Sequence, residues 1–155
     1  WDNQVSNDLI LNYQVGYERQ LVAYRNIFSL SADAQARVGT LSDKATLGAT
    51  MIIGYFDSPF GGKNATANNF RIYAYDRPAV NAVAYDATLQ GGMFNNSSPY
   101  VIASGDVSRI TLQNRYGFVI AYRRIFLEYF QSVITKEFSK GDTHVWGGVQ
   151  LSFGL

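Results

Sequence analysis

The sequence predicts an all-β protein, an antiparallel transmembrane β-barrel of the outer-membrane kind. Three observations support this prediction. Residues 144–155 alternate between apolar and small or polar side chains and stop on an apolar residue, which is typical of the closing strand of an outer-membrane barrel. Only 16% of the residues are charged, whereas soluble domains have roughly 25%. The chain also contains 11 Tyr and 10 Phe, residue types that favour strands over helices.

Six segments of the chain show the two-residue period of a half-buried strand. They are residues 9–19, 27–38, 44–55, 107–122, 125–138 and 144–155. The first three are each close to the ~9–11 residues that a tilted strand needs to cross a bilayer. A seventh segment, residues 70–86, fits two interpretations: one long strand kinked at Pro78, or a short strand followed by a helix from Ala79. The sequence thus predicts about seven strands.

The connections between these segments predict how the chain is oriented. Residues 57–69 and 88–105 are rich in Gly, Asn and Ser and form loops, whereas Arg123 and Arg124 form a tight turn. If Leu155 ends in the periplasm, the 88–105 loop, the turn at residues 139–142 and the segment before the first strand are extracellular. The same counting places the 57–69 loop in the periplasm, where turns are usually short. If residues 70–86 contained two strands, the predicted side of the membrane would be reversed for every connection before residue 70.

Composition excludes several classes of function. The net charge is +1 with no basic run, so nucleic acid is not an expected partner. Cysteine is absent, which removes disulfides, thiol catalysis and thiolate metal sites. The Gly-x-Ser-x-Gly motif of serine hydrolases is also missing.

Because the chain begins at Trp1 rather than Met, we expect a processed or truncated product that forms a single domain over residues 1–155.

Polar residues give few candidates for chemistry. His144 is the one histidine and lies on the polar face near the predicted extracellular rim, but a catalytic imidazole needs partners, so we expect a structural role. Five of the acidic residues are candidates for a carboxylate or calcium site, but they lack the close spacing that calcium needs. They are Asp33, Asp106, Glu18, Glu128 and Glu137. A polar lumen would instead pair opposite charges. The residues expected to pair are Glu18, Arg37, Arg109, Arg115, Glu128 and Lys136.

A soluble β-protein is an alternative explanation of the same apolar–polar alternation. A β-sandwich or a lipocalin-like barrel would bury the apolar faces as a core. Two features favour lipid as the surroundings: the last strand keeps its apolar pattern to its end, and tyrosines lie near strand ends, as in an aromatic girdle. These tyrosines are Tyr13, Tyr17, Tyr55, Tyr116 and Tyr122.

Several short segments, taken in order and spacing, resemble the C-terminal half of the LpxR-type outer-membrane lipid A deacylases. They are WDNQV (1–5), YER (17–19), VGT (38–40), AVAYDATLQGG (82–92), LEY (127–129), TKEF (135–138) and HVWG (144–147). The resemblance implies a twelve-stranded barrel, of which this chain would supply the last seven strands. It also implies hydrolysis of the 3′-linked acyl ester of lipid A with calcium, so lipid A and outer-membrane lipids would be the partners.

The resemblance places every catalytic element before residue 1, including the histidine that would act as general base. It therefore implies that this chain holds no catalytic residue and no calcium ligand. Trp1, Asn3 and Gln4 would follow the catalytic histidine and are the candidates for lining the substrate groove. The alternative is a barrel that has lost its catalytic residues and serves as an inactive subunit of a larger outer-membrane complex, since seven strands do not close by themselves.

Overall fold

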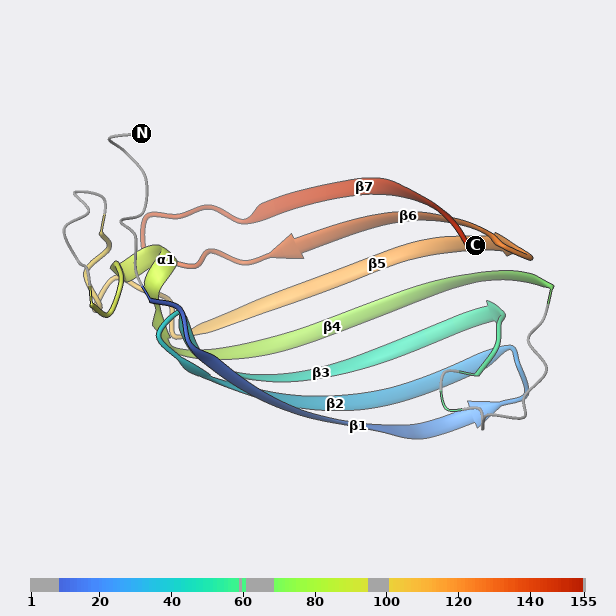
Figure 1. The fold of residues 1–155 in the computed structure, drawn as a ribbon, viewed down its shortest axis with the longest axis horizontal. Coiled ribbons are helices and arrows are strands. Elements are labelled where there is room, and N and C mark those ends of the chain that lie inside the picture. The colour runs from blue at the N-terminus through green and yellow to red at the C-terminus, as the bar shows by residue number, and fades with distance from the viewer. Residues whose placement is uncertain (1–8, 59, 61–68, 95–100, 155) are drawn as a thin grey trace.

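The computed structural model describes residues 9–58, 60, 69–94 and 101–154. They form one antiparallel sheet in which each strand pairs with its neighbours in sequence (Figure 1). The strands are β1 (Asn12–Tyr24), β2 (Phe28–Gly39), β3 (Ser42–Tyr55), β4 (Phe70–Asp86), β5 (Ile110–Tyr122), β6 (Ile125–Ile134) and β7 (His144–Phe153), and one short helix, α1 (Ala87–Gln90), follows β4. The predicted all-β fold with seven strands is confirmed.

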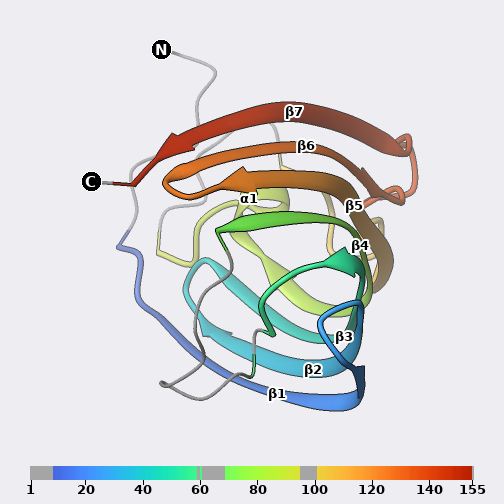
Figure 2. The same cartoon turned by 90° about the vertical axis from the view of Figure 1, so that its right-hand side faces the viewer.

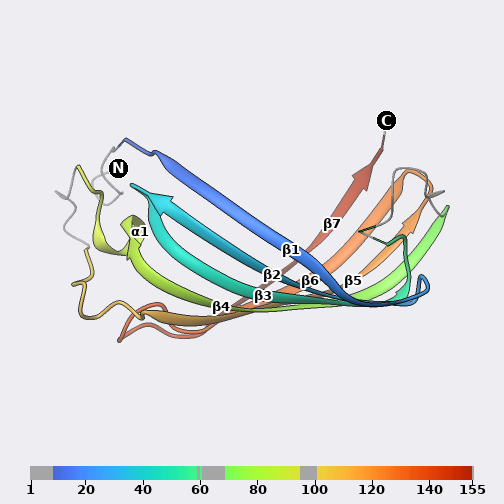
Figure 3. The same cartoon turned by 90° about the horizontal axis from the view of Figure 1, so that it is seen from below.

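The sheet is strongly curved and open. Viewed from its end it forms an arc, and viewed from below it forms a trough (Figures 2 and 3). Within the described residues, β1 and β7 are the two edges of the sheet and do not pair with each other. An uncovered edge presents unpaired backbone N–H and C=O groups, which a bilayer does not tolerate. The sheet therefore has the form of part of a barrel wall.

The two faces of the sheet differ in polarity, as strict alternation along each strand requires. The convex face carries large apolar side chains that remain exposed, for example Leu47, which is 66% exposed at the middle of β3. The concave face carries most of the polar side chains and a small apolar cluster. That cluster contains Ile52, Phe56, Tyr75 and Val119, with Tyr73, Phe126 and Phe130 packed against it. Apolar outside and polar inside is the arrangement of a transmembrane barrel.

The ambiguous segment forms one strand of 17 residues, so the prediction of one long strand is confirmed and no helix begins at Ala79. The pairing of β4 with β3 is interrupted between the Gly48–Ala79 and Met51–Asp76 pairs. Pro78 lies in this gap, and proline has no N–H group to donate to a neighbouring strand. On its other side Pro78 stays in register with Asn114 of β5.

Some boundaries differ from the predicted ones. β1 continues to Tyr24 instead of ending near residue 19, through a bulge between Gln20 and Val22 that keeps it paired with β2. Residues 107–109 and 135–138 lie outside β5 and β6, where Val107 and Phe138 form an isolated bridge. Alternation alone does not show at which residue two neighbouring segments stop pairing by backbone hydrogen bonds.

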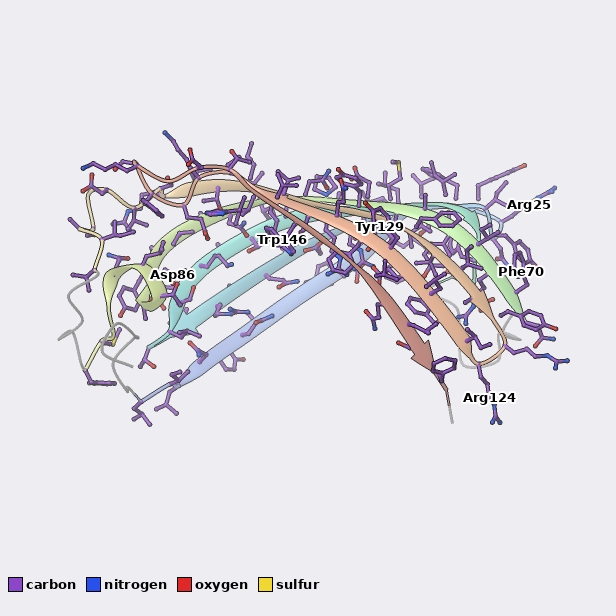
Figure 4. All side chains as sticks on the ribbon, turned by 90° about the horizontal axis from the view of Figure 1, so that it is seen from above. Arg25, Phe70, Asp86, Arg124, Tyr129 and Trp146 are labelled. Carbon is purple, nitrogen blue, oxygen red and sulfur yellow. The ribbon has the colours of Figure 1, made fainter. Side chains whose placement is uncertain are left out.

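Strand parity sorts the connections to two ends of the sheet. We call one the loop end; among the described residues it carries residues 40–41, 87–94, 101–109 and 135–143. The turn end carries residues 25–27, the turn at Arg123 and Arg124, and Gly154. Figure 4 shows Asp86 at the loop end and Arg25, Phe70 and Arg124 at the turn end. Among the described residues, no helix has the length and apolar character needed to cross a bilayer.

Candidate functional site

The concave face holds a polar groove of about 620 Å³ that crosses β1 to β5. Its polar lining residues include Glu18, Ser29, Ser31, Asp33, Gln35, Thr46, Gln113 and Arg115. In a closed barrel this face is the lumen, which is polar in outer-membrane barrels. The groove therefore marks the interior of the wall that these strands build.

A three-residue network lies at the end of this groove, on three neighbouring strands. Tyr75 of β4 donates its hydroxyl to Oε1 of Glu128 on β6. Arg115 of β5 donates Nη2 to the same Oε1 at 3.1 Å and Nε to the Tyr75 hydroxyl at 3.3 Å. Glu128 is 8% exposed, so its negative charge depends on these two donors for compensation. The network joins the three strands through their side chains.

Two cation–π contacts involve residues of the same network. The Arg115 guanidinium carbon lies 4.0 Å from the centroid of the Phe130 ring, and that of Arg77 lies 4.9 Å from the Tyr75 ring. Gly117 pairs with both Tyr75 and Phe130 in the sheet register. A Cβ at Gly117 would lie 2.7 Å from the Tyr75 hydroxyl oxygen. The absence of a side chain at this position gives the tyrosine ring its space.

Most of the predicted lumen charges do not pair with one another, and that prediction was wrong except for Arg115 and Glu128, whose ion pair the structure contains. Glu18 accepts a hydrogen bond from Ser31 at 2.7 Å, because the residue opposite Glu18 is Asp33. Arg37 donates Nε and Nη2 to Oε1 of Gln14, at 3.1 and 2.8 Å. The register thus places neutral partners or like charges opposite most of these groups.

Arg109 and Lys136 lie outside the strands at the loop end, so neither reaches the lumen network. The guanidinium group of Arg109 donates to the backbone carbonyls of Ala84 and Ser104 and to the Ser104 hydroxyl. Arg109 therefore ties the end of β4 to the far part of the loop at residues 87–109. A guanidinium group that donates to backbone carbonyls in place of backbone N–H groups holds the loop in position and does not serve as a ligand-binding group.

Further contacts join the two long loops of the loop end. The Ser139 N–H donates to the Asp106 carbonyl at 2.7 Å and the Ser108 N–H to the Glu137 carbonyl at 2.8 Å. The Ser139 hydroxyl also donates to the Asp106 carboxylate at 3.1 Å. α1 turns toward the concave side of the sheet (Figures 2 and 3), and Tyr85 holds its end by donating to the Gly91 carbonyl at 2.6 Å. The loop end is thus a rim whose loops are held together by hydrogen bonds.

His144 opens β7 at this rim, opposite Ile134, and its side chain is exposed. In the part of the chain that the structure describes, no group of three or more His, Asp or Glu side chains comes together as a metal site. Asp106 and Glu137 lie in the rim loops, away from Glu18, Asp33 and Glu128 on the strands. The candidate groove residues Trp1, Asn3 and Gln4 lie outside the described residues.

Sequence reasoning missed Tyr75, the residue that connects β4 to the Arg115–Glu128 pair. It lies in residues 70–86, where the period was ambiguous. The signal was present as an alternation of Tyr73, Tyr75 and Arg77 against Ile72, Ala74 and Asp76. Pro78 and the charged residues on both faces masked that alternation.

Comparison with known proteins agrees with this wall-like architecture. The family described as Outer membrane protein LpxR matches residues 1–155. Among solved structures, LpxR from Salmonella typhimurium is similar with a TM-score of 0.79 and 17% sequence identity, over 100% of this chain and 55% of that chain. The chain thus spans about half the length of that relative. No curated protein matches the chain. Because the family match covers all 155 residues, the chain belongs to the outer membrane protein LpxR family.

Proposed function

We propose that the full-length protein is an outer-membrane lipid A deacylase that hydrolyses the 3′-linked acyl ester, and that the residues described here build its far wall and rim. The observation that carries this proposal is the family match over residues 1–155 together with the shared barrel fold. The apolar convex face agrees with a substrate that lies in the membrane.

The path of the chain supports a site at the loop end. The segment before β1 approaches this end, because the Thr40 hydroxyl donates to the Leu9 carbonyl at 2.7 Å and accepts from the Leu11 N–H at 2.9 Å. We propose that the catalytic histidine that the resemblance implies, upstream of Trp1, also lies at this end, with the loop residues 101–109 and 135–143. We further propose that the loop end is extracellular and that the C-terminus is periplasmic.

Calcium, which the resemblance implies, does not fit the residues described here. Calcium needs six to eight oxygen ligands that converge from close positions. Among the described residues no such acidic cluster exists, and Glu18 and Glu128 are occupied by Ser31 and by the Tyr75–Arg115 pair. We assign no calcium ligand to this chain and derive no step through the ion.

Lipid A mass spectrometry tests the proposal. The full-length gene is expressed in a strain whose lipid A carries an intact 3′-acyl ester, and the expected result is the loss of that acyl group. A matched variant in which the histidine expected shortly before Trp1 is replaced by alanine should leave lipid A unchanged. Intact lipid A in cells that contain the folded full-length protein would overturn the proposal.

One feature of the convex face favours the second candidate, an inactive subunit of a larger outer-membrane complex. Asp76, Tyr116 and Gln131 are in register across β4, β5 and β6 on this face. The Tyr116 hydroxyl donates to Gln131 at 2.5 Å. Polar groups that face lipid are costly near the bilayer midplane, whereas a contacting protein can supply hydrogen-bond partners.

Photo-crosslinking from residue 116 of the full-length protein in intact membranes tests this second candidate. A specific crosslinked protein, absent when the probe is placed at Leu47, together with intact lipid A, would support the subunit function. Crosslinks to lipid alone from both positions would contradict it.

A further inference from the structure

Two corners at the turn end have the same construction. Tyr24 ends β1 and is followed by Arg25, and Tyr122 ends β5 and is followed by Arg123. The guanidinium carbon of each arginine lies 5.5 Å from the centroid of the tyrosine ring before it. Stacking of this kind holds a guanidinium group close to the ring face. We call these pairs the Tyr-Arg corners.

The backbone places both arginines in the same unusual conformation. Arg25 has a φ of 48° and Arg123 a φ of 52°, and they are the non-glycine residues with positive φ in the described part of the chain. This left-handed region is disfavoured for L-residues, and Asn, Asp or Gly usually occupy it. Neither corner uses those residue types, although either turn would be less strained with them.

The Arg123 corner opens into a cleft of about 630 Å³ lined by Asn69, Tyr122, Arg123, Arg124 and Ile125. Two backbone hydrogen bonds hold its walls: the Arg123 N–H donates to the Asn69 carbonyl at 2.6 Å, and the Gly154 N–H donates to the Arg124 carbonyl at 2.7 Å. The cleft therefore combines a fixed backbone frame with two guanidinium groups.

The cleft lies at the border between the apolar convex face and the turns. Tyr122 and Ile125 are paired neighbours on the convex face and are 52% and 47% exposed. In a membrane barrel, tyrosines at strand ends lie at the level of the lipid headgroups. The guanidinium groups just beyond them are then at the depth of the phosphates.

The positive charge at these corners is uncompensated within the described residues. The ion pairs among the described residues join Arg71 to Asp57 and Arg115 to Glu128. Neither pair includes Arg25, Arg123 or Arg124. A ligand for this cleft thus needs a negative group for the arginines and an apolar part for Tyr122 and Ile125. Arginine is well suited to phosphate because its donors match the phosphate oxygens in pairs.

We propose that the two Tyr-Arg corners are binding sites for the phosphate headgroup of a glycerophospholipid, with the lipid tails lying along the convex face. Each corner binds one phosphate through its arginine, and the stacked tyrosine keeps the guanidinium group at headgroup depth. The proposal concerns the lipid at the turn end and goes beyond hydrolysis, which is proposed at the loop end.

Native mass spectrometry of the delipidated full-length protein in mild detergent tests this proposal. The probes are phosphatidylglycerol and a diacylglycerol with the same acyl chains but no phosphate. We expect phosphatidylglycerol to bind more tightly than the diacylglycerol. In the double variant R25Q/R123Q each corner loses one cation, so each corner should bind phosphatidylglycerol about fivefold more weakly. The matched control K140Q removes a cation at the loop end and should leave the affinity unchanged.

Two further measurements keep the test decisive. The double variant R25K/R123K keeps the charges but loses the paired donors and the stacked guanidinium group, so it should bind phosphatidylglycerol more tightly than R25Q/R123Q and less tightly than the wild type. Raising the salt concentration should weaken phosphatidylglycerol binding to the wild type, because exposed charges are screened. Equal binding of the two lipids, salt-independent binding, or undiminished affinity in the folded R25Q/R123Q variant would each overturn the proposal. Loss of deacylase activity has no bearing on these results.

Discussion

Arg115 on β5 reaches Glu128 on β6 by crossing the ring of Phe130. The residue directly opposite Arg115 is Ser132, and Glu128 lies opposite Val119, so the ion pair is diagonal. The guanidinium group passes 4.0 Å from the Phe130 ring centroid and donates to Glu128 at 3.1 Å. Tyr75 then adds a third strand to the pair. The ion pair, the ring and the tyrosine thus form one structural unit in the lumen wall.

Removing the acid should therefore leave two donors without their acceptor. We expect Glu128→Ala to lower the free energy of unfolding by about 2 kcal/mol, less than for a fully buried pair because the Arg115 side chain is 38% exposed. Urea unfolding of the full-length protein in lipid vesicles measures this. Glu18→Gln, which affects a lone bond to Ser31, should change stability by less than about 0.5 kcal/mol. Equal effects of the two variants would contradict the network.

Gly117 should not tolerate a side chain. A Cβ there would lie 2.6 Å from the Tyr129 carbonyl oxygen as well as 2.7 Å from the Tyr75 hydroxyl oxygen, and the backbone oxygen has little freedom to move. We expect Gly117→Ala to destabilise the protein by about 1–3 kcal/mol in the same unfolding assay. Gly105→Ala is the control, because nothing lies within 4 Å of its Cβ position. A neutral Gly117→Ala would show that Tyr75 does not pack as described.

The two faces of β2 and β3 should respond differently to a new charge. Leu47→Arg places a cation on the lipid-facing side near the middle of β3 and should cost about 2–4 kcal/mol in a bilayer. Gln35→Arg places the same charge in the polar groove and should have little effect. Folding into vesicles, followed by the heat-induced shift in gel mobility, compares the two. A larger loss for Gln35→Arg would mean that the convex face does not contact lipid.

His144 should be dispensable for the proposed hydrolysis. It is exposed at the start of β7, and the described residues place no carboxylate pair or metal site around it. We expect His144→Ala in the full-length protein to leave the 3′-deacylation of lipid A unchanged, as judged by mass spectrometry of extracted lipid A. Loss of activity in a folded His144→Ala variant would indicate that His144 is itself the general base.

The sequence by itself determined the class of fold and the number of strands. Alternation in segments such as residues 144–155 is a local property, because successive side chains point to opposite faces whatever the strand pairs with. It therefore also determined which face is apolar, as the exposed Leu47 and Val149 confirm. Residues 70–86 stayed ambiguous, since Pro78 and charges on both faces weaken that local signal.

Only the tertiary structure decided which polar side chains meet. Contacts in a sheet depend on register and on diagonal reach, so Glu18 lies opposite Asp33, and Arg115 and Glu128 form the one ion pair, within the described residues, among the charges that were predicted to pair. The cleft beside Arg123 is also tertiary, because it is lined by Asn69 and held by the bond from Gly154 to Arg124, both from distant parts of the chain. Alternation is determined within each strand, whereas register and loop packing depend on residues far apart in the sequence.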